Sequence, residues 1–193
     1  MKKIVLVFFC LILACAAMAQ AKPAPATAPL PAFEAYAGAG QVAVSKSGSA
    51  AAYSVNFQTQ LAAGFRYFPA EKFAVDVSYF HDTVSIGRWL AVHNFIQPKP
   101  ITALQYSAVG LYAEYWPVRN DHGGVFVFAG PQEFLGTGGF ANKTGLAAGV
   151  GAQYVLWRGL FVESRAAFWH VQDFLGIPVA NTYDAGLSVG YRF

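Results

Sequence analysis

The sequence predicts an all-β fold, an eight-stranded antiparallel up-and-down β-barrel that crosses a membrane. Three observations favour it. Segments that alternate apolar and polar residues recur from residue 33 to residue 193, and no helical periodicity of useful length interrupts them. The composition is 55% hydrophobic and 16% aromatic, which is more apolar side chain than a soluble domain of this size needs. The links between segments alternate between long and short. A lipid-exposed barrel accounts for all three.

The N-terminus has the three parts of a secretory signal. Lys2 and Lys3 precede an apolar run that ends at Ala17-Met18-Ala19, so we expect cleavage after Ala19. The run is short for a spanning helix, which needs about 20 apolar residues. An alternative is that residues 12–15 form a lipobox and that Cys15 is lipidated. Residues 20–32 are rich in Pro and Ala, and we expect an extended linker there.

Cysteine and charge content exclude several functions. Cys10 and Cys15 both lie in the signal, so the mature chain has no thiol for a disulfide, for thiolate catalysis or for a Cys-ligated metal. Two of the 13 Lys and Arg residues also lie there, and the remainder nearly balance the 10 Asp and Glu residues. Charge therefore gives no indication of nucleic-acid binding. We predict no cofactor.

Eight segments of period-two character define the predicted strands. They run over residues 33–44, 53–68, 73–82, 104–116, 124–133, 143–156, 160–170 and 182–193. One face of the second segment carries Tyr53, Val55, Phe57, Leu61, Phe65 and Tyr67. Aromatic residues stand at both ends of this face, as in the girdles at the two membrane interfaces.

The other segments follow the same alternation. The apolar faces of the third, fourth, sixth and seventh begin at Phe73, Val109, Ala148 and Leu160. The fifth segment has apolar residues on both faces, so its register stays open. In the last segment the apolar face carries Tyr183, Ala185, Leu187, Val189, Tyr191 and Phe193, and small or charged residues occupy the other face.

The lengths of the links carry independent information. On these boundaries they are 8, 4, 21, 7, 9, 3 and 11 residues long. An even-stranded barrel with a periplasmic N-terminus, short periplasmic turns and long external loops has this alternation. The short links contain turn-forming sequences such as residues 120–123 (Asn-Asp-His-Gly) and 157–159 (Trp-Arg-Gly).

A soluble β-sandwich or a lipocalin-like barrel is the alternative fold, because it also has short alternating strands. Its interior would have to be the apolar face. The opposite face here is rich in Gly, Ala and Ser with a few charges. Such small residues fill a narrow lumen and leave the apolar face for lipid, so the sequence favours the membrane barrel.

The signal, the linker, the eight segments and the ending Gly190-Tyr191-Arg192-Phe193 resemble the small outer-membrane β-barrels of the outer membrane protein A or X transmembrane-domain type. The resemblance implies a monomer in the outer membrane, in contact with its lipid and lipopolysaccharide. It also implies that the barrel assembly machinery reads Val189, Tyr191 and Phe193. It implies no activity, since this fold hosts anchors, adhesins, lipid enzymes and narrow channels.

Seven charged residues fall on predicted inward faces. They are Arg66, Asp76, Glu114, Glu163, Arg165, Asp184 and Arg192. An unpaired charge inside a barrel is costly, so we expect an ion-pair network that fills the lumen. The alternative is a gate that opens to small ions. Eight strands leave an interior filled by side chains, which argues against a general porin.

An enzymatic alternative rests on His170, with Asp173 nearby and Asp184 on the next strand. The placement is similar to that of outer-membrane lipid A deacylases, whose His-x-Ser motif on the penultimate strand works with an acid on the last strand. Gln172 stands where the nucleophilic serine is required, and alternation places His170 outward. We therefore expect no enzyme, and expect His170 to be interfacial beside Trp169.

Residues 83–103 form a long and unusually apolar link. We expect it to cap the barrel mouth or to contact a ligand or partner, and Arg88 and Lys99 are placed to meet lipid phosphates. A metal site of His81, Asp82 and His93 is not predicted, because the spacing matches no ligand motif. Three glycines among residues 136–139 indicate an external turn, since the strand-loop-helix context of a phosphate loop is missing.

These observations together predict a non-enzymatic outer-membrane barrel with a structural or surface-interaction role exerted through four external loops. Two alternatives stay open, a narrow or gated pore and a deacylase-like lipid enzyme.

Overall fold

The computed structural model describes residues 33–46, 53–55, 58–84, 86–92, 95–100, 104–135, 141–174 and 177–193. The predicted signal and linker lie outside the described residues, as do the three glycines of residues 136–139. In the described part of the chain, no helix is long and apolar enough to span a membrane.

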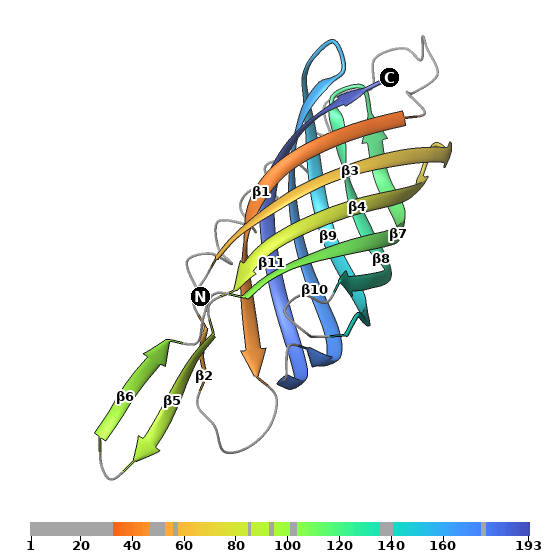
Figure 1. Ribbon diagram of the computed structural model, residues 1–193. Coiled ribbons are helices and arrows are strands. Elements are labelled where there is room, and N and C mark those ends of the chain that lie inside the picture. The colour runs from red at the N-terminus through yellow and green to blue at the C-terminus, as the bar shows by residue number, and fades with distance from the viewer. Residues whose placement is uncertain are drawn as a thin grey trace.

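Eight strands form a closed barrel in which every neighbouring pair is antiparallel (Figure 1). They are β1 (Phe33–Lys46), β3 (Gln58–Ala70), β4 (Phe73–Val84), β7 (Leu104–Asn120), β8 (Gly123–Leu135), β9 (Lys143–Trp157), β10 (Leu160–Phe174) and β11 (Ile177–Arg192). The first and last strands close the barrel in a register that pairs Glu34 with Arg192. The predicted eight-stranded antiparallel barrel is confirmed.

Three two-residue turns lie at one end of the barrel, hereafter the turn end. They are Glu71–Lys72, Asp121–His122 and Arg158–Gly159. Both ends of the barrel chain meet there, because the Phe193 amide donates to the Phe33 carbonyl at 2.9 Å. Gly159 has φ of 89°, a conformation that an L side chain rarely adopts. The longer links lie at the opposite end, hereafter the loop end.

A second, three-stranded sheet has the order β2–β5–β6. Its strands are β2 (Tyr53–Val55), β5 (Ile86–Val92) and β6 (Phe95–Pro100), and the β5–β6 hairpin extends past the loop end in Figure 1. One expectation was wrong here. The segment 53–68 does not form one barrel strand, because residues 53–55 pair with β5. Most of the link 83–103 forms the β5–β6 hairpin.

The two faces of the barrel strands separate as alternation predicts. Val77 of β4 is 48% exposed, and its neighbour Asp76 is buried. Leu111 of β7 is 51% exposed, and its neighbour Tyr112 is buried. The structure also settles the face of the fifth segment, β8. Phe126 is buried there, and Val127 is 47% exposed. The lumen side of β8 is therefore aromatic.

Gly64 of β3 shows how tightly the lumen is filled. A Cβ atom at this position would meet the ring of Tyr36, its register partner on β1. We expect Gly64→Leu to displace that ring and to lower the free energy of unfolding by about 1–3 kcal/mol, the usual cost of overpacking. Urea titration followed by tryptophan fluorescence measures it. Ala63→Leu, on the exposed face, is the control, and an equal loss in both variants would contradict this packing.

Candidate functional site

Arg66 is the centre of a buried network of charges in the lumen. Its guanidinium lies 2.7 Å from Glu34, 2.6 Å from Glu114 and 3.5 Å from Asp76. Its two terminal nitrogens donate to the two carboxylate oxygens of Glu163 at 3.0 and 3.2 Å. Four carboxylates from four different strands thus converge on one arginine. All five side chains are fully or almost fully buried, so protein atoms replace water around each charge.

Arg165 of β10 extends the network toward the loop end. It lies 3.0 Å from Glu114 and 3.5 Å from Asp76, so it shares two carboxylates with the central arginine. It also donates to the Tyr36 hydroxyl at 2.7 Å, and that hydroxyl donates to Asp76 at 2.7 Å. Ser78 donates a further hydrogen bond to Asp76. The two arginines therefore cannot move independently of each other.

Glu34 links the network to the turn end. Arg192 lies 3.0 Å and Arg119 lies 3.8 Å from its carboxylate. Gln153 donates to Glu34 at 2.8 Å and accepts a hydrogen bond from Arg192. Arg192 also donates to the main-chain carbonyl of Asn120 at 3.1 Å, next to a turn. The first and last strands are thus joined through side chains as well as through their backbones.

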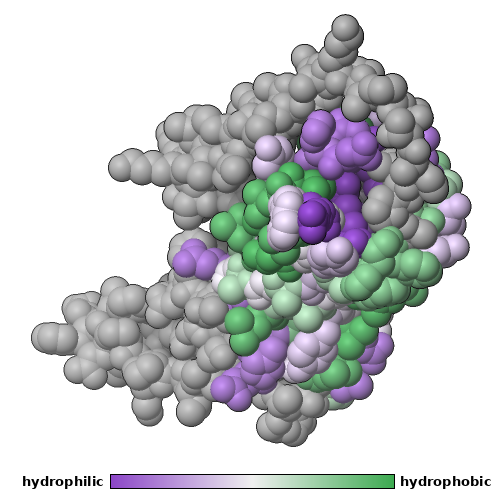
Figure 2. Space-filling view, turned by 90° about the horizontal axis from the view of Figure 1, so that it is seen from above, coloured by the Kyte–Doolittle hydropathy of each residue, from purple (hydrophilic) through white to green (hydrophobic). Residues whose placement is uncertain are grey.

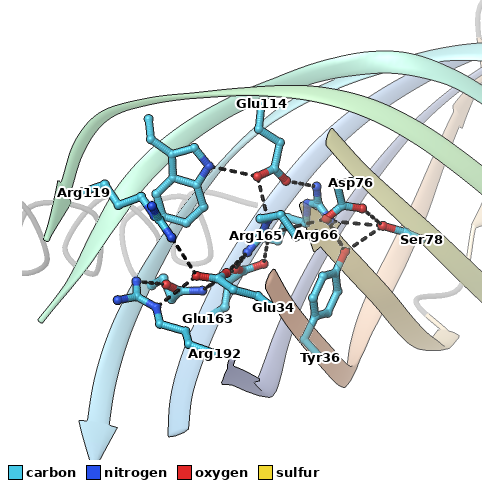
Figure 3. A network of polar contacts seen from close by, with 12 residues as sticks. Glu34, Tyr36, Arg66, Asp76, Ser78, Glu114, Arg119, Glu163, Arg165 and Arg192 are labelled. Atoms are coloured by element: carbon cyan, nitrogen blue, oxygen red, sulfur yellow. Dashed lines mark hydrogen bonds and ion pairs between the residues drawn. The ribbon is translucent and has the colours of Figure 1, made fainter. Parts of the chain in front are cut away.

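We call this set the lumen cluster (Figure 3). Its members are Glu34, Tyr36, Arg66, Asp76, Ser78, Glu114, Arg119, Gln153, Glu163, Arg165 and Arg192. Figure 2 looks onto the turn end, where strongly hydrophilic residues appear in the middle with hydrophobic residues beside them. The arginines and carboxylates contact one another directly, so a ligand that bound any of them would displace an ion-pair partner.

Aromatic rings support the arginines of the lumen cluster. The Arg66 guanidinium carbon is 5.1 Å from the ring centre of Trp116 and 4.9 Å from that of Phe126. These two rings stack on each other at 4.5 Å. Arg119 lies 3.5 Å from the ring centre of Phe68. Such cation–π contacts gain strength when water is excluded, and they hold the arginines in place.

The half of the lumen nearer the loop end is mainly aromatic. Phe134 lies 4.6 Å from Trp169 and 5.9 Å from Tyr106, measured between ring centres. All three are at most 2% exposed. Asp82 is also buried there and accepts a hydrogen bond from Gln60 at 3.4 Å. Side chains therefore fill this level of the lumen as well.

All but one of the seven charged residues singled out from the sequence belong to the lumen cluster. The exception is Asp184, which lies on the loop side of the cluster, where its carboxylate accepts hydrogen bonds from Gln60 and Trp169 and interacts electrostatically with Arg165. Sequence reasoning missed Glu34 and Arg119. Glu34 lay inside a predicted strand next to Phe33. The alternation of these two residues could have placed Glu34 on the inward face. Arg119 lay beyond the predicted end of its strand.

Within the described residues, His170 and Asp184 do not come together. His170 is exposed on β10 and pairs with Asn181 and Leu146, whereas Asp184 pairs with Ala167, three residues before His170 on β10. The side chains of Gln172 and Asp173 lie outside the described part. The expectation that Trp169 is interfacial was wrong, because alternation turns it into the lumen, where it is fully buried.

A different serine and histidine do meet on the outer wall near the loop end. The Ser107 hydroxyl lies 3.1 Å from His81 Nδ1 and 2.8 Å from the Tyr79 hydroxyl. Alternation within one segment could not predict this contact, because it depends on the register between β4 and β7, in which His81 pairs with Ser107. Among the described hydrogen bonds and ion pairs, none joins a carboxylate to His81. The contact satisfies polar groups where the wall changes from apolar to polar.

The outer wall carries a band of exposed apolar side chains between two sets of exposed aromatic rings. Near the turn end these rings are Phe33, Phe65, Tyr67, Phe73, Tyr115, Tyr154, Trp157, Tyr191 and Phe193, and near the loop end they are Tyr79, Phe168 and Tyr183. The band between them includes Val77, Leu111, Val127, Val150 and Leu187, which are 40–63% exposed. This is the pattern of a lipid-facing barrel wall with aromatic girdles.

The C-terminal residues predicted as an assembly signal lie on the outer wall. Val189, Tyr191 and Phe193 are exposed at 53%, 45% and 65%, and a role for them in assembly stays a prediction. Within the described residues, no group of three or more His, Cys, Asp or Glu side chains could hold a metal ion. The side chain of His93 lies outside those residues.

Solved structures with this fold come from bacterial outer membranes. OprG from Pseudomonas aeruginosa has a TM-score of 0.60 at 14% identity, over 85% of this chain and 96% of that one. Neisserial surface protein A has a TM-score of 0.56 at 17% identity, over 83% of this chain and 97% of that one. Ail of Yersinia pestis has a TM-score of 0.53 at 16% identity, over 86% of this chain and 100% of that one. No protein-family model and no curated protein matches the sequence. The likeness concerns the fold, and the chain has the fold of small outer-membrane β-barrels.

Proposed function

We propose that this protein is an outer-membrane barrel with a closed lumen, which acts as a structural or surface-interaction protein through its loop end. Its N-terminus lies on the periplasmic side and its partners include outer-membrane lipid and lipopolysaccharide. The observation that carries the proposal is the combination of an apolar outer wall with a lumen filled by ion pairs. The apolar outer wall suits a bilayer. Because the lumen is filled, the protein would contact its partners through its outer surface.

The outer wall supports a membrane location. A soluble barrel would not leave Leu111, Val77 and Leu187 half exposed in one continuous band. The fold shared with OprG, Ail and the neisserial protein supports the outer membrane among bacterial membranes. Heat-modifiable migration of the protein on a gel after outer-membrane fractionation tests this location. A soluble periplasmic product would refute it.

The lumen cluster supports a closed barrel over a general porin. Arg66 contacts four carboxylates and is fully buried, and the aromatic layer of Tyr106, Phe134 and Trp169 lies on its loop side. An eight-stranded barrel has room for such side chains and little else.

Planar-bilayer recordings separate the closed barrel from the pore. We expect the wild-type protein to give no conductance steps, because ions would have to displace buried ion pairs. Steps that disappear in Glu114→Ala or Arg165→Ala, and persist in Glu133→Ala, would instead establish a narrow pore through the lumen cluster. Glu133 is the control because it is exposed on the outer side of β8.

A further inference from the structure

Asp82 of β4 is a buried carboxylate without a cationic partner among the described residues. It is 1% exposed and lies in the aromatic half of the lumen. Gln60, Tyr106 and Asp184 are the groups that act on its charge, and none of them is positively charged. Its Oδ1 atom also has no hydrogen-bond partner in the described part of the chain. Burying a carboxylate in this way is costly unless a positive charge or a proton neutralises it.

Asp184 of β11 is the second carboxylate at this level of the lumen. The Gln60 side chain joins the two, because it donates to Asp82 at 3.4 Å and also forms a hydrogen bond with Asp184. The two carboxylates act on each other electrostatically, and like charges repel. Two acidic side chains from β4 and β11 thus meet at one amide side chain.

Arg165 does not neutralise this pair. It is the arginine that acts on Asp184, but it already lies 3.0 Å from Glu114 and 3.5 Å from Asp76. Its single positive charge is therefore divided among three carboxylates, and it is not among the groups that act on Asp82.

The described lumen contains more carboxylates than arginines. Its six carboxylates are Glu34, Asp76, Asp82, Glu114, Glu163 and Asp184, and its four arginines are Arg66, Arg119, Arg165 and Arg192. Lys143 stands half-buried at the loop-end rim and is not among the groups that act on Asp82. The first four strand-borne partners of Arg66 are paired, so the excess of two negative charges lies at Asp82 and Asp184.

The chemistry of this pair suits a small, hard cation. Carboxylate, amide and hydroxyl oxygens are the ligands that calcium and magnesium prefer, and Gln60 and Tyr106 supply the neutral oxygens here. One divalent cation would balance both excess charges. An organic ammonium would supply one charge and would need more room than the packed rings of Phe134 and Trp169 leave.

We propose that Asp82 and Asp184 bind one divalent cation, best matched by calcium, on the loop side of the lumen cluster. With two carboxylates in the site, the remaining ligands are the neutral oxygens of Gln60 and Tyr106 and water. The bound cation would hold β4 and β11 together at the loop end. The inference goes beyond the proposed function and does not depend on it, because the site lies inside the barrel.

Terbium luminescence tests the site directly. Terbium(III) binds where calcium binds, and it emits when a nearby tryptophan is excited; Trp169 forms a hydrogen bond with Asp184. We expect terbium chloride to emit with the full protein in phosphatidylcholine vesicles, and calcium chloride to compete. In the Asp82→Asn/Asp184→Asn double variant the emission should fall to that of vesicles without protein. Glu133→Gln is the control, because it removes an exposed carboxylate of the outer wall, and it should emit like the wild type.

Urea titration supplies a second readout. We expect the wild type to unfold at a higher urea concentration in calcium chloride than in EDTA at equal ionic strength, because a ligand that binds the folded barrel stabilises it. The double variant should unfold alike in both. In EDTA it should unfold at a higher urea concentration than the wild type, because the repulsion is gone. A purely structural role for the two carboxylates predicts the opposite order in EDTA.

Two outcomes would overturn the inference. One is terbium emission that persists in the double variant while heat-modifiable migration shows a folded barrel, since the cation would then bind elsewhere. The other is unfolding of the wild type that calcium leaves unchanged. If acid alone then raises the urea midpoint, protons neutralise the pair instead of a cation. Neither result affects the proposed membrane location, which fractionation tests separately.

Discussion

Replacing Arg66 with methionine is expected to lower the free energy of unfolding of the barrel by about 3–5 kcal/mol, the cost of breaking a buried ion pair from one side. The reason is the number of carboxylates that depend on this residue. Glu34, Asp76, Glu114 and Glu163 all lie within 3.5 Å of its guanidinium. Methionine keeps much of the side-chain volume, so lost charge rather than a cavity dominates the effect.

Urea titration of the protein in lipid vesicles, followed by tryptophan fluorescence, measures the change. Arg158→Met is the matched control, because Arg158 is exposed at a turn and such substitutions usually stay within about 0.5 kcal/mol. Adding Glu163→Gln to Arg66→Met should restore part of the loss, since it removes one carboxylate that the first change leaves without its bidentate partner. If Arg66→Met unfolds at the wild-type urea concentration, the lumen cluster does not stabilise the barrel.

The faces of the strands could be predicted from the sequence because alternation is a local property. Asp76 and Glu114 each stand between outward apolar neighbours, and a two-residue period places them inside. Which charge meets which could not be predicted in this way, because contacts across the lumen depend on the register of all eight strands. The convergence of four carboxylates on Arg66 is such a contact.

Strand ends were less predictable for a different reason. β7 continues through Pro117 by means of an irregularity between Tyr115 and Val118, whereas the predicted strand ended at residue 116. The continuation brings Arg119 into the lumen cluster. Irregularities of this kind shift the alternation by a residue, so a count in steps of two stops short of them.

The three-stranded sheet was missed because alternation does not specify a partner. Tyr53 and Val55 have the same parity as Leu61 and Phe65, which made one long strand the simplest interpretation. β1 pairs with β3 only as far as Gln58, opposite Val42. Residues 53–55 pair instead with β5, and the apolar composition of residues 86–92 did not indicate that pairing.

Replacing Leu111 with arginine is the sharpest test of the lipid-facing wall. Leu111 is 51% exposed on β7 and pairs with Val77, between the rings of Tyr79 and Tyr115. Near the middle of a bilayer an arginine on the lipid face costs about 2–4 kcal/mol. We expect a loss of that size in urea titrations in vesicles, because the guanidinium must leave water for hydrocarbon or distort the bilayer to reach it.

Leu156→Arg is the matched control, since Leu156 is 53% exposed but lies next to the Arg158–Gly159 turn. At such an interface the same substitution costs about 0–1 kcal/mol. Exposure alone predicts equal effects for the two variants, whereas depth in a bilayer predicts that Leu111→Arg is the more destabilising. Equal and small losses would mean that the outer wall faces water. The difference between the two variants therefore reports on the environment of the wall, independently of how the lumen is packed.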